Sequence, residues 1–261
     1  MSAQIESHQG DRKMTKSKSN QKGLYVAAVA LILIFQQFAS KVGNLVAGCF
    51  DYKAIDEYGI FAHVSVHHIV QLLIALLAIS ILAKKLKIDF GFGLGNKKTG
   101  TKYVLWFTAA VFGFTAITYA VRYFGNQIIQ YDYPLNAKNV LGTMGFQLLL
   151  SGPSEEVLFR ALPIGVLAFL NESNKERRFT KLNISLEVII AAVLFSIAHI
   201  KWTVSPFSIS MNILQLIYCF VLGIADGKAY QESGSVIYPM MMHSISNVIT
   251  VGLGYILTII V

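Results

Sequence analysis

The chain has 261 residues, of which 54% are hydrophobic and only 14% are charged. Soluble globular domains carry about 25% charged residues, so this composition excludes a soluble protein and indicates an integral membrane protein. We attribute the net charge of +8 to the membrane topology and to attraction by anionic lipid headgroups. We expect no nucleic acid partner.

The elements begin with residues 1–22, which are polar and basic. We expect them to form a disordered cytoplasmic tail, since no apolar stretch follows closely enough for a cleaved signal peptide. Seven apolar stretches follow, and a helix needs ~20 mostly apolar residues to span a bilayer. These stretches are 24–48, 65–83, 103–121, 140–170, 184–200, 208–225 and 235–261.

The predicted fold class is therefore all-α: a polytopic transmembrane bundle of about seven or eight helices around a polar intramembrane cavity. The count stays open because 140–170 is long for one span and contains Ser151-Gly152-Pro153, so it can form two pieces. We expect N-terminal transmembrane helices over 23–139 and a catalytic helix core over 140–261.

The distribution of Lys and Arg predicts the orientation. If the N-terminus is cytoplasmic and every stretch crosses the membrane, sixteen of the 22 Lys and Arg lie in cytoplasmic segments and five lie outside. Cytoplasmic loops carry an excess of these residues. The sequence thus predicts a multi-pass cell membrane protein with a cytoplasmic N-terminus.

Three histidines, His63, His67 and His68, stand at the start of the second stretch. They also suit a metal site, but we expect them to form a polar cap at the external interface.

The fourth stretch contains Glu155-Glu156-Val-Leu-Phe-Arg160. Ionisable groups at membrane depth are costly and usually functional. Pro153 suits the first turn of a helix with Ser154 beside it as a cap, which places both acids near a helix N-terminus. Glu156 and Arg160 are four residues apart and share a helix face. Glu155 is rotated away, so we expect Glu155 to be the acid without a partner, able to act as a base.

Two later stretches carry histidines, in Phe195-Ser-Ile-Ala-His199 and His243-Ser-Ile-Ser-Asn247. His243 and Asn247 are four residues apart on one helix face. Each group has a structural alternative: the acids and arginine as a buried ion-pair network, His199 as an interfacial residue, and the His/Asn pair as hydrogen bonds between helices.

These side chains suit hydrolysis without a covalent nucleophile. A glutamate and a histidine can activate water for attack on a carbonyl, and a second histidine with an asparagine amide can stabilise the oxyanion. The sequence lacks HExxH and GxSG. Asp132 and Asp226 are placed at the ends of spans, so we expect no intramembrane aspartate pair.

In this order, EEVLFR, FSIAH and HSISN resemble the EExxxR, FxxxH and HxxxN/D motifs of the CPBP family, which comprises CAAX proteases and bacteriocin-processing (Abi) proteins. The resemblance covers Glu155 to Asn247 and implies an intramembrane glutamate-dependent endopeptidase. It implies that Glu155 is the water-activating base and His199 its partner. It also implies that His243 and Asn247 donate hydrogen bonds to the oxyanion, and that Glu156 and Arg160 form a supporting ion pair.

We expect no cofactor to be required, because asparagine is a poor zinc ligand, although Glu155, Glu156, His199 and His243 are chemically able to bind zinc. The expected partners are the lipid bilayer and a membrane-associated peptide or protein substrate. CAAX-type cleavage follows from the resemblance, while the short chain with compact loops favours processing of a bacteriocin, pheromone or leader peptide, or self-immunity. The alternatives are a non-catalytic membrane scaffold or immunity protein, and a transporter with an ion-coupled acid, which predicts inverted repeats.

Overall fold

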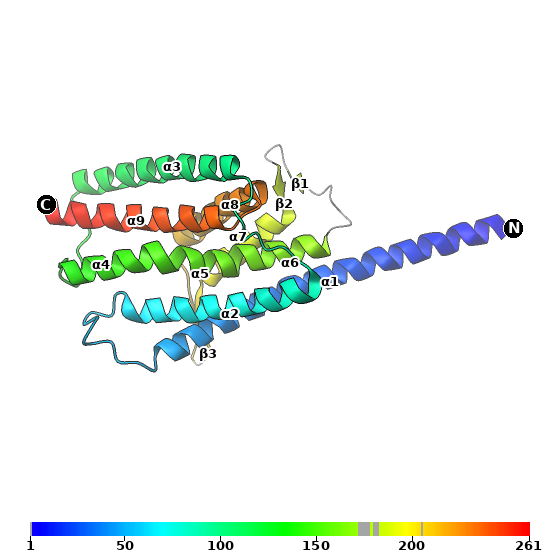
Figure 1. The fold of residues 1–261 in the computed structure, drawn as a ribbon, viewed down its shortest axis with the longest axis horizontal. Coiled ribbons are helices and arrows are strands. Elements are labelled where there is room, and N and C mark those ends of the chain that lie inside the picture. Colours follow the sequence, from blue (N-terminus) through cyan, green and yellow to red (C-terminus); the bar gives the residue numbers. More distant parts are fainter. Residues whose placement is uncertain (1, 172–177, 180–182, 205) are drawn as a thin grey trace.

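The computed structural model describes residues 2–171, 178–179, 183–204 and 206–261. Within these ranges the chain is a bundle of helices whose two ends lie at opposite ends of the bundle (Figure 1). The helices are α1 (Ser2–Ala47), α2 (Ala62–Leu86), α3 (Lys97–Phe124), α4 (Ala137–Phe146), α5 (Gly152–Glu156), α6 (Leu162–Leu170), α7 (Leu186–Ala198), α8 (Ile213–Ser233) and α9 (Ile237–Ile260).

Two π-helical turns, η1 (Gln147–Ser151) and η2 (Val157–Ala161), join α4, α5 and α6 without a gap. Residues 137–170 are therefore one helical rod, and the described part of the chain holds seven rods. The predicted all-α membrane bundle is confirmed. Five helices are long and apolar enough to cross a membrane, namely α2, α3, α8, α9 and α1 from Gln21 onward. The shorter α7 is also apolar.

The first helix begins at Ser2. The structure therefore continues the first spanning helix back through residues for which we expected a disordered tail.

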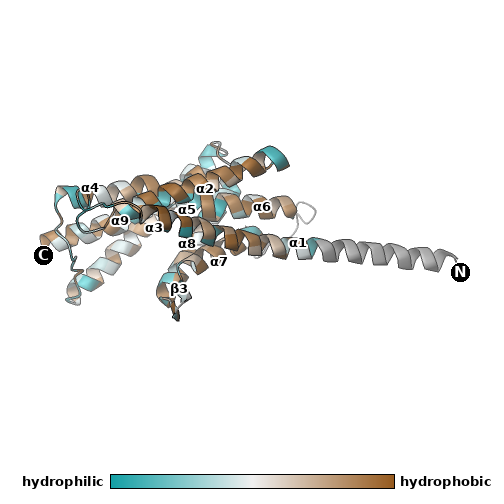
Figure 2. Ribbon diagram, turned by 90° about the horizontal axis from the view of Figure 1, so that it is seen from below, coloured by the Kyte–Doolittle hydropathy of each residue, from teal (hydrophilic) through white to brown (hydrophobic). Residues whose placement is uncertain are grey.

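The bundle exposes apolar side chains on its outside, as a protein surrounded by lipid does. Figure 2 shows hydrophobic residues along the helices and hydrophilic ones at helix ends and in loops. On α3, Leu105, Trp106 and Ile117 each expose about two thirds of their surface. The main buried cluster joins α1 and α2 to α6 through Ala39, Ala75 and Leu162.

The loop before α2 is organised by Asp56, which is buried. Its carboxylate accepts hydrogen bonds from the backbone N–H groups of Ile60, Phe61 and Ala62, at 2.7–3.0 Å. Burial alone raises the pKa of Asp56, but these backbone donors outweigh burial and lower the pKa below its ordinary value. The carboxylate therefore caps the start of α2 in its charged form.

Two antiparallel hairpins complete the described fold. One pairs β1 (Arg178–Phe179) with β2 (Ile184–Ser185), directly before α7. The other pairs β3 (Lys201–Val204) with β4 (Phe207–Ser210), between α7 and α8. Lys41 of α1 lies 4.3 Å from the centre of the Trp202 ring, which connects the second hairpin to α1.

Candidate active site

The acidic motif lies where the rod 137–170 departs from α-helical geometry. The turns η1 and η2 flank Gly152–Glu156, and such π turns occur frequently at functional sites. The predicted helix start at Pro153 is wrong: Ser151 has helical angles, φ −58° and ψ −61°, so the helix passes through. A proline only removes one N–H, and a π turn rearranges the bonds around that gap. Ser154 does not cap a helix start, and its hydroxyl donates to the Ser151 carbonyl at 3.5 Å.

Pro163, near the start of α6, leaves a backbone carbonyl of the rod without its helical partner. In η2 the Leu162 N–H donates to the Val157 carbonyl, five residues back. The next bond of this pattern needs an N–H from Pro163, which has none, so the Leu158 carbonyl is left free. Gln36 of α1 donates to that carbonyl at 3.1 Å. A freed backbone acceptor is thereby satisfied from a neighbouring helix, as the membrane interior requires.

A buried cluster of charges holds this rod against α8. Arg160 Nε lies 3.1 Å from Glu156 Oε2, and Arg160 Nη2 lies 3.5 Å from Asp226 Oδ2. The three side chains are at most 1% exposed. These atoms are at ion-pair distance without the alignment of hydrogen bonds. The guanidinium also lies 4.0 Å from the centre of the Phe195 ring, which adds a cation–π contact.

The predicted pairing of Glu156 with Arg160 is present, but Asp226 corrects the sequence analysis. We placed Asp226 at the end of a span because the predicted stretch stopped at residue 225, whereas α8 continues to Ser233. An aspartate one residue past an apolar stretch is still inside the helix if the helix continues.

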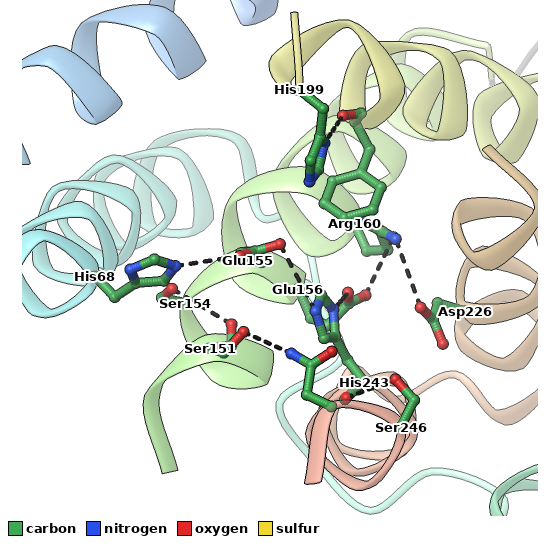
Figure 3. A network of polar contacts seen from close by, with 12 residues as sticks. His68, Ser151, Ser154, Glu155, Glu156, Arg160, His199, Asp226, His243 and Ser246 are labelled. Atoms are coloured by element: carbon green, nitrogen blue, oxygen red, sulfur yellow. Dashed lines mark hydrogen bonds and ion pairs between the residues drawn. The ribbon is translucent and has the colours of Figure 1, made fainter. Parts of the chain in front are cut away.

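His243 of α9 bridges the two consecutive acids. Its Nδ1 is 2.7 Å from Glu156 Oε1, and its Nε2 is 3.7 Å from Glu155 Oε2. Figure 3 shows the imidazole between these two carboxylates. Motifs that are 87 positions apart in the sequence therefore meet, as the hydrolase hypothesis requires.

Glu155 has a partner that the sequence analysis did not assign. His68 Nε2 of α2 lies 3.1 Å from Glu155 Oε1. The expectation that His68 is part of an interfacial cap is therefore wrong, because the side chain is buried within the bundle at the acid. Glu155 is also not the acid without a partner, since His68 and His243 approach its two oxygens.

The two acids differ in their access to water. The side chain of Glu155 is 19% exposed, whereas that of Glu156 is fully buried. Glu155 lines a cavity of about 150 Å³ between α1, α2, the rod and α7. A water molecule occupies about 30 Å³ in the liquid, so this cavity has room for ordered water. Its polar lining comprises Gln36, Gln37, Ser40, His67, His68, Gln71, Glu155 and His199.

His199 lies in the same cavity wall as Glu155, at the end of α7. Its Nδ1 is 2.9 Å from the Phe195 carbonyl, which can only accept, so Nδ1 carries the hydrogen. In the neutral ring, Nε2 is then an acceptor. Figure 3 shows the ring of His199 on the side of Arg160 opposite Asp226. His199 is thus brought to the cavity of Glu155 without a direct hydrogen bond between them.

Asn247 lies one turn beyond His243 on α9 and reaches the rod. Its Nδ2 donates to Ser151 Oγ at 2.9 Å. The lining of the cavity includes Glu155 and His199 but neither His243 nor Asn247. The structure therefore brings the predicted residues to one polar cluster, with the cavity on one side of Glu155 and the α9 pair on another.

One trio among the described residues has ligand atoms close enough for a metal ion: Glu156, Asp226 and His243, within 4.8 Å of one another. Arg160 already lies against both of these carboxylates. A guanidinium compensates the charge that a divalent cation would otherwise balance, so this trio is a poor fit for a metal.

A comparison with known protein families finds a match in the region that contains the three motifs. Residues 137–249 match the model of the type II CAAX prenyl endopeptidase Rce1-like family. This part of the chain is therefore similar to that family. The match contains all three motifs, so the predicted resemblance to the CPBP family is confirmed. Searches of curated proteins and of solved structures gave no match. The matched region comprises α4 to α6, α7, α8 and about half of α9, while His68 and Gln36 come from helices that precede it.

Sequence reasoning missed His68, Asp226, Ser151 and Gln36. A signal existed for three of them, because each is a polar or ionisable residue in or beside an apolar stretch, the same criterion that identified Glu155. The criterion does not say which helix faces which, so it could not pair His68 with the acid. No signal distinguished Ser151 from the other serines in the spans.

Proposed function

We propose that this Rce1-like membrane protein is an intramembrane endopeptidase in which Glu155 activates a water molecule in the cavity. The observation that carries the proposal is the exposure of Glu155 to a polar cavity, whereas the side chain of the neighbouring Glu156 is fully buried. A buried ion-pair network explains Glu156, but it does not explain why a second carboxylate faces the cavity.

The proposed reaction begins with water held between Glu155 and His199. Glu155 accepts a proton as the water oxygen attacks the peptide carbonyl carbon. The same proton then passes to the leaving nitrogen when the C–N bond breaks. His199 Nε2, as an acceptor, orients the water through its second hydrogen. No covalent intermediate with the protein forms, and the carboxylate is regenerated in each turnover.

We further propose that His243 and Asn247 supply hydrogen bonds to the oxyanion. Their spacing of four residues on α9 directs both side chains toward the rod, where they contact Glu156 and Ser151. Apo active sites often hold their donors in internal bonds that rearrange in the transition-state complex. The substrate is a membrane-associated peptide or protein, and processing of a bacteriocin, pheromone or leader peptide is the class that we favour.

The proposed mechanism requires no cofactor, since water activation is assigned to Glu155 and charge compensation at Glu156 and Asp226 to Arg160. Activity should therefore survive prolonged incubation with a strong chelator followed by desalting. Loss of activity that added zinc restores would assign the histidines to a metal and contradict this part of the proposal.

Cleavage of peptides by the purified protein in lipid nanodiscs tests the function. We would offer a library of membrane-anchored peptides, with and without a C-terminal lipid, and identify products by mass spectrometry. Glu155→Gln should abolish cleavage while the protein stays folded. Glu57→Gln is the matched control, since it makes the same chemical change in an exposed loop.

Two outcomes contradict the proposal. Full activity per folded molecule in Glu155→Gln removes Glu155 as the base. Peptides that bind to the wild type without being cut, with equal binding by Glu155→Gln, would support the alternative of a non-catalytic scaffold.

A further inference from the structure

His68 is held more firmly than a side chain at a lipid interface. The ring is buried on α2, and its Nδ1 is 2.8 Å from the Val64 carbonyl, one turn earlier. The rings of Phe146 and His67 pack edge-on against it, with their centres 4.9 and 5.0 Å from the centre of the His68 ring. These contacts fix the plane of the imidazole and direct Nε2 at Glu155 Oε1, 3.1 Å away.

The two polar contacts of this ring indicate how it meets Glu155. The Val64 carbonyl can only accept, so Nδ1 carries a hydrogen. If the ring were neutral and the acid ionised, the Nε2 lone pair would face a carboxylate oxygen, which is repulsive. The contact at Nε2 is therefore favourable when Nε2 donates a hydrogen bond to the carboxylate oxygen.

The charges of the surrounding cluster favour hydrogen-bond donors at the acids. Three acids, Glu155, Glu156 and Asp226, gather around one guanidinium. Two imidazoles, those of His68 and His243, contact the acids. The acids outnumber the guanidinium, so hydrogen bonds donated by the two imidazoles help to compensate the carboxylates in a low-dielectric interior.

We propose that His68 is a positioning residue for Glu155, outside the Rce1-like segment: it donates the hydrogen bond that fixes the carboxylate beside the cavity. This inference deepens the proposed function and rests on it for the catalytic consequence, but the contact itself does not. Because His68 binds Oε1 and His243 approaches Oε2, the two rings clamp the carboxylate plane from two helices. Removing one ring leaves the acid free to rotate.

The kinetic test compares His68→Gln with His68→Leu. Glutamine keeps an N–H donor at similar reach, whereas leucine fills the space without one. We expect His68→Leu to lower kcat about 10²-fold, the scale of a small misplacement of a reacting group, with KM unchanged. His68→Gln should recover most of that loss. His63→Leu, on the same helix and outside the cavity lining, is the matched control and should retain activity.

Two kinetic results would overturn the role. One is a kcat of wild-type size in His68→Leu. The other is a His68→Gln variant as slow as His68→Leu, since that would show that the hydrogen-bond donor is not what matters.

A second measurement needs no activity and so separates this inference from the proposed function. Thermal unfolding of purified wild type, His68→Leu, Glu155→Leu and the double variant forms a double-mutant cycle. Each single change leaves a buried polar partner without its bond, while the double change removes both. We expect the double variant to unfold at a higher temperature than the two single shifts predict when added. Additive shifts would show that His68 and Glu155 are not coupled, whether or not the protein cuts peptides.

Discussion

The contact between the rod 137–170 and α9 depends on Gly152. A Cβ placed on this residue would clash with Ser244 Oγ and would lie 2.6 Å from the Met240 carbonyl oxygen. The hydroxyl can rotate away, but the carbonyl belongs to the backbone of α9. Moving that contact from 2.6 Å to the 3.4 Å at which ordinary contact begins requires a displacement of about 0.8 Å. We therefore expect Gly152→Ala to displace α9, which carries His243 and Asn247.

The magnitude follows from two opposing effects. Forcing a methyl group into a packed interior costs about 1–3 kcal/mol. Alanine in place of glycine in a helix returns about 0.5–1 kcal/mol. The expected net loss for Gly152→Ala is therefore at most about 2.5 kcal/mol of unfolding free energy. The effect on turnover should be larger, about 10²-fold, because a displacement near 1 Å at reacting groups has that consequence.

The assay pairs thermal unfolding in detergent with peptide cleavage per folded molecule. Gly145→Ala is the control in the same rod, because no atom lies within 4 Å of the position of its added Cβ. That variant should be as stable as the wild type or slightly more stable, and as active. If Gly152→Ala behaves like Gly145→Ala in both measurements, the close approach of the rod to α9 does not position the site.

Four further changes test other parts of the structure. Arg160→Met should reduce the yield of folded protein, because uncompensated buried charge costs about 3–5 kcal/mol; a wild-type yield would refute this. Asp56→Asn should lower stability at neutral pH by about 1 kcal/mol. Since the folded-state pKa of Asp56 is lowered, its contribution to stability is present above the unfolded pKa and is lost as pH falls through the folded pKa. The stabilities of wild type and Asp56→Asn should therefore converge in acid. A stability difference that stays constant with pH would contradict this. Asn247→Ala should lower turnover about 10²–10³-fold, and Ser151→Ala should lower it much less. Equal losses in the two variants would show that Asn247 acts only through its contact between α9 and the rod. A reporter fused after Lys85 should report cytoplasm, and an external signal would reverse the proposed orientation.

The fold was predictable because the signals that define it are local. Apolar length alone located the spans, and the structure places helices over each of them. The spacing of Glu156 and Arg160 predicted their contact, which depends on one helix only. The course of the rod through Pro153 was not predictable from proline alone, because the π turns that accommodate it leave no sequence signature as plain as a cap.

The site was predictable as a set of residue types and less so as a set of contacts. Expensive side chains in apolar stretches identified Glu155, His199 and His243 without any geometry. Their partners depend on which helix faces which, and that information is distributed over the whole bundle. His68 shows the limit: its position near the start of a span suggested an interface, whereas the packing of α2 against the rod buries it at Glu155.

Two consecutive glutamates on one helix point in directions about 100° apart, so they meet different surroundings by necessity. In this chain one direction leads to Arg160, Asp226 and the Nδ1 of His243, where the side chain of Glu156 is fully buried. The other leads to the cavity, where the carboxylate stays 19% exposed. A charge compensated entirely by protein groups holds helices together but is unavailable to substrate. In the mechanism that we propose, the carboxylate clamped by two imidazoles, with one side open to the cavity, takes the proton from water, and the two acids of the motif then have different roles.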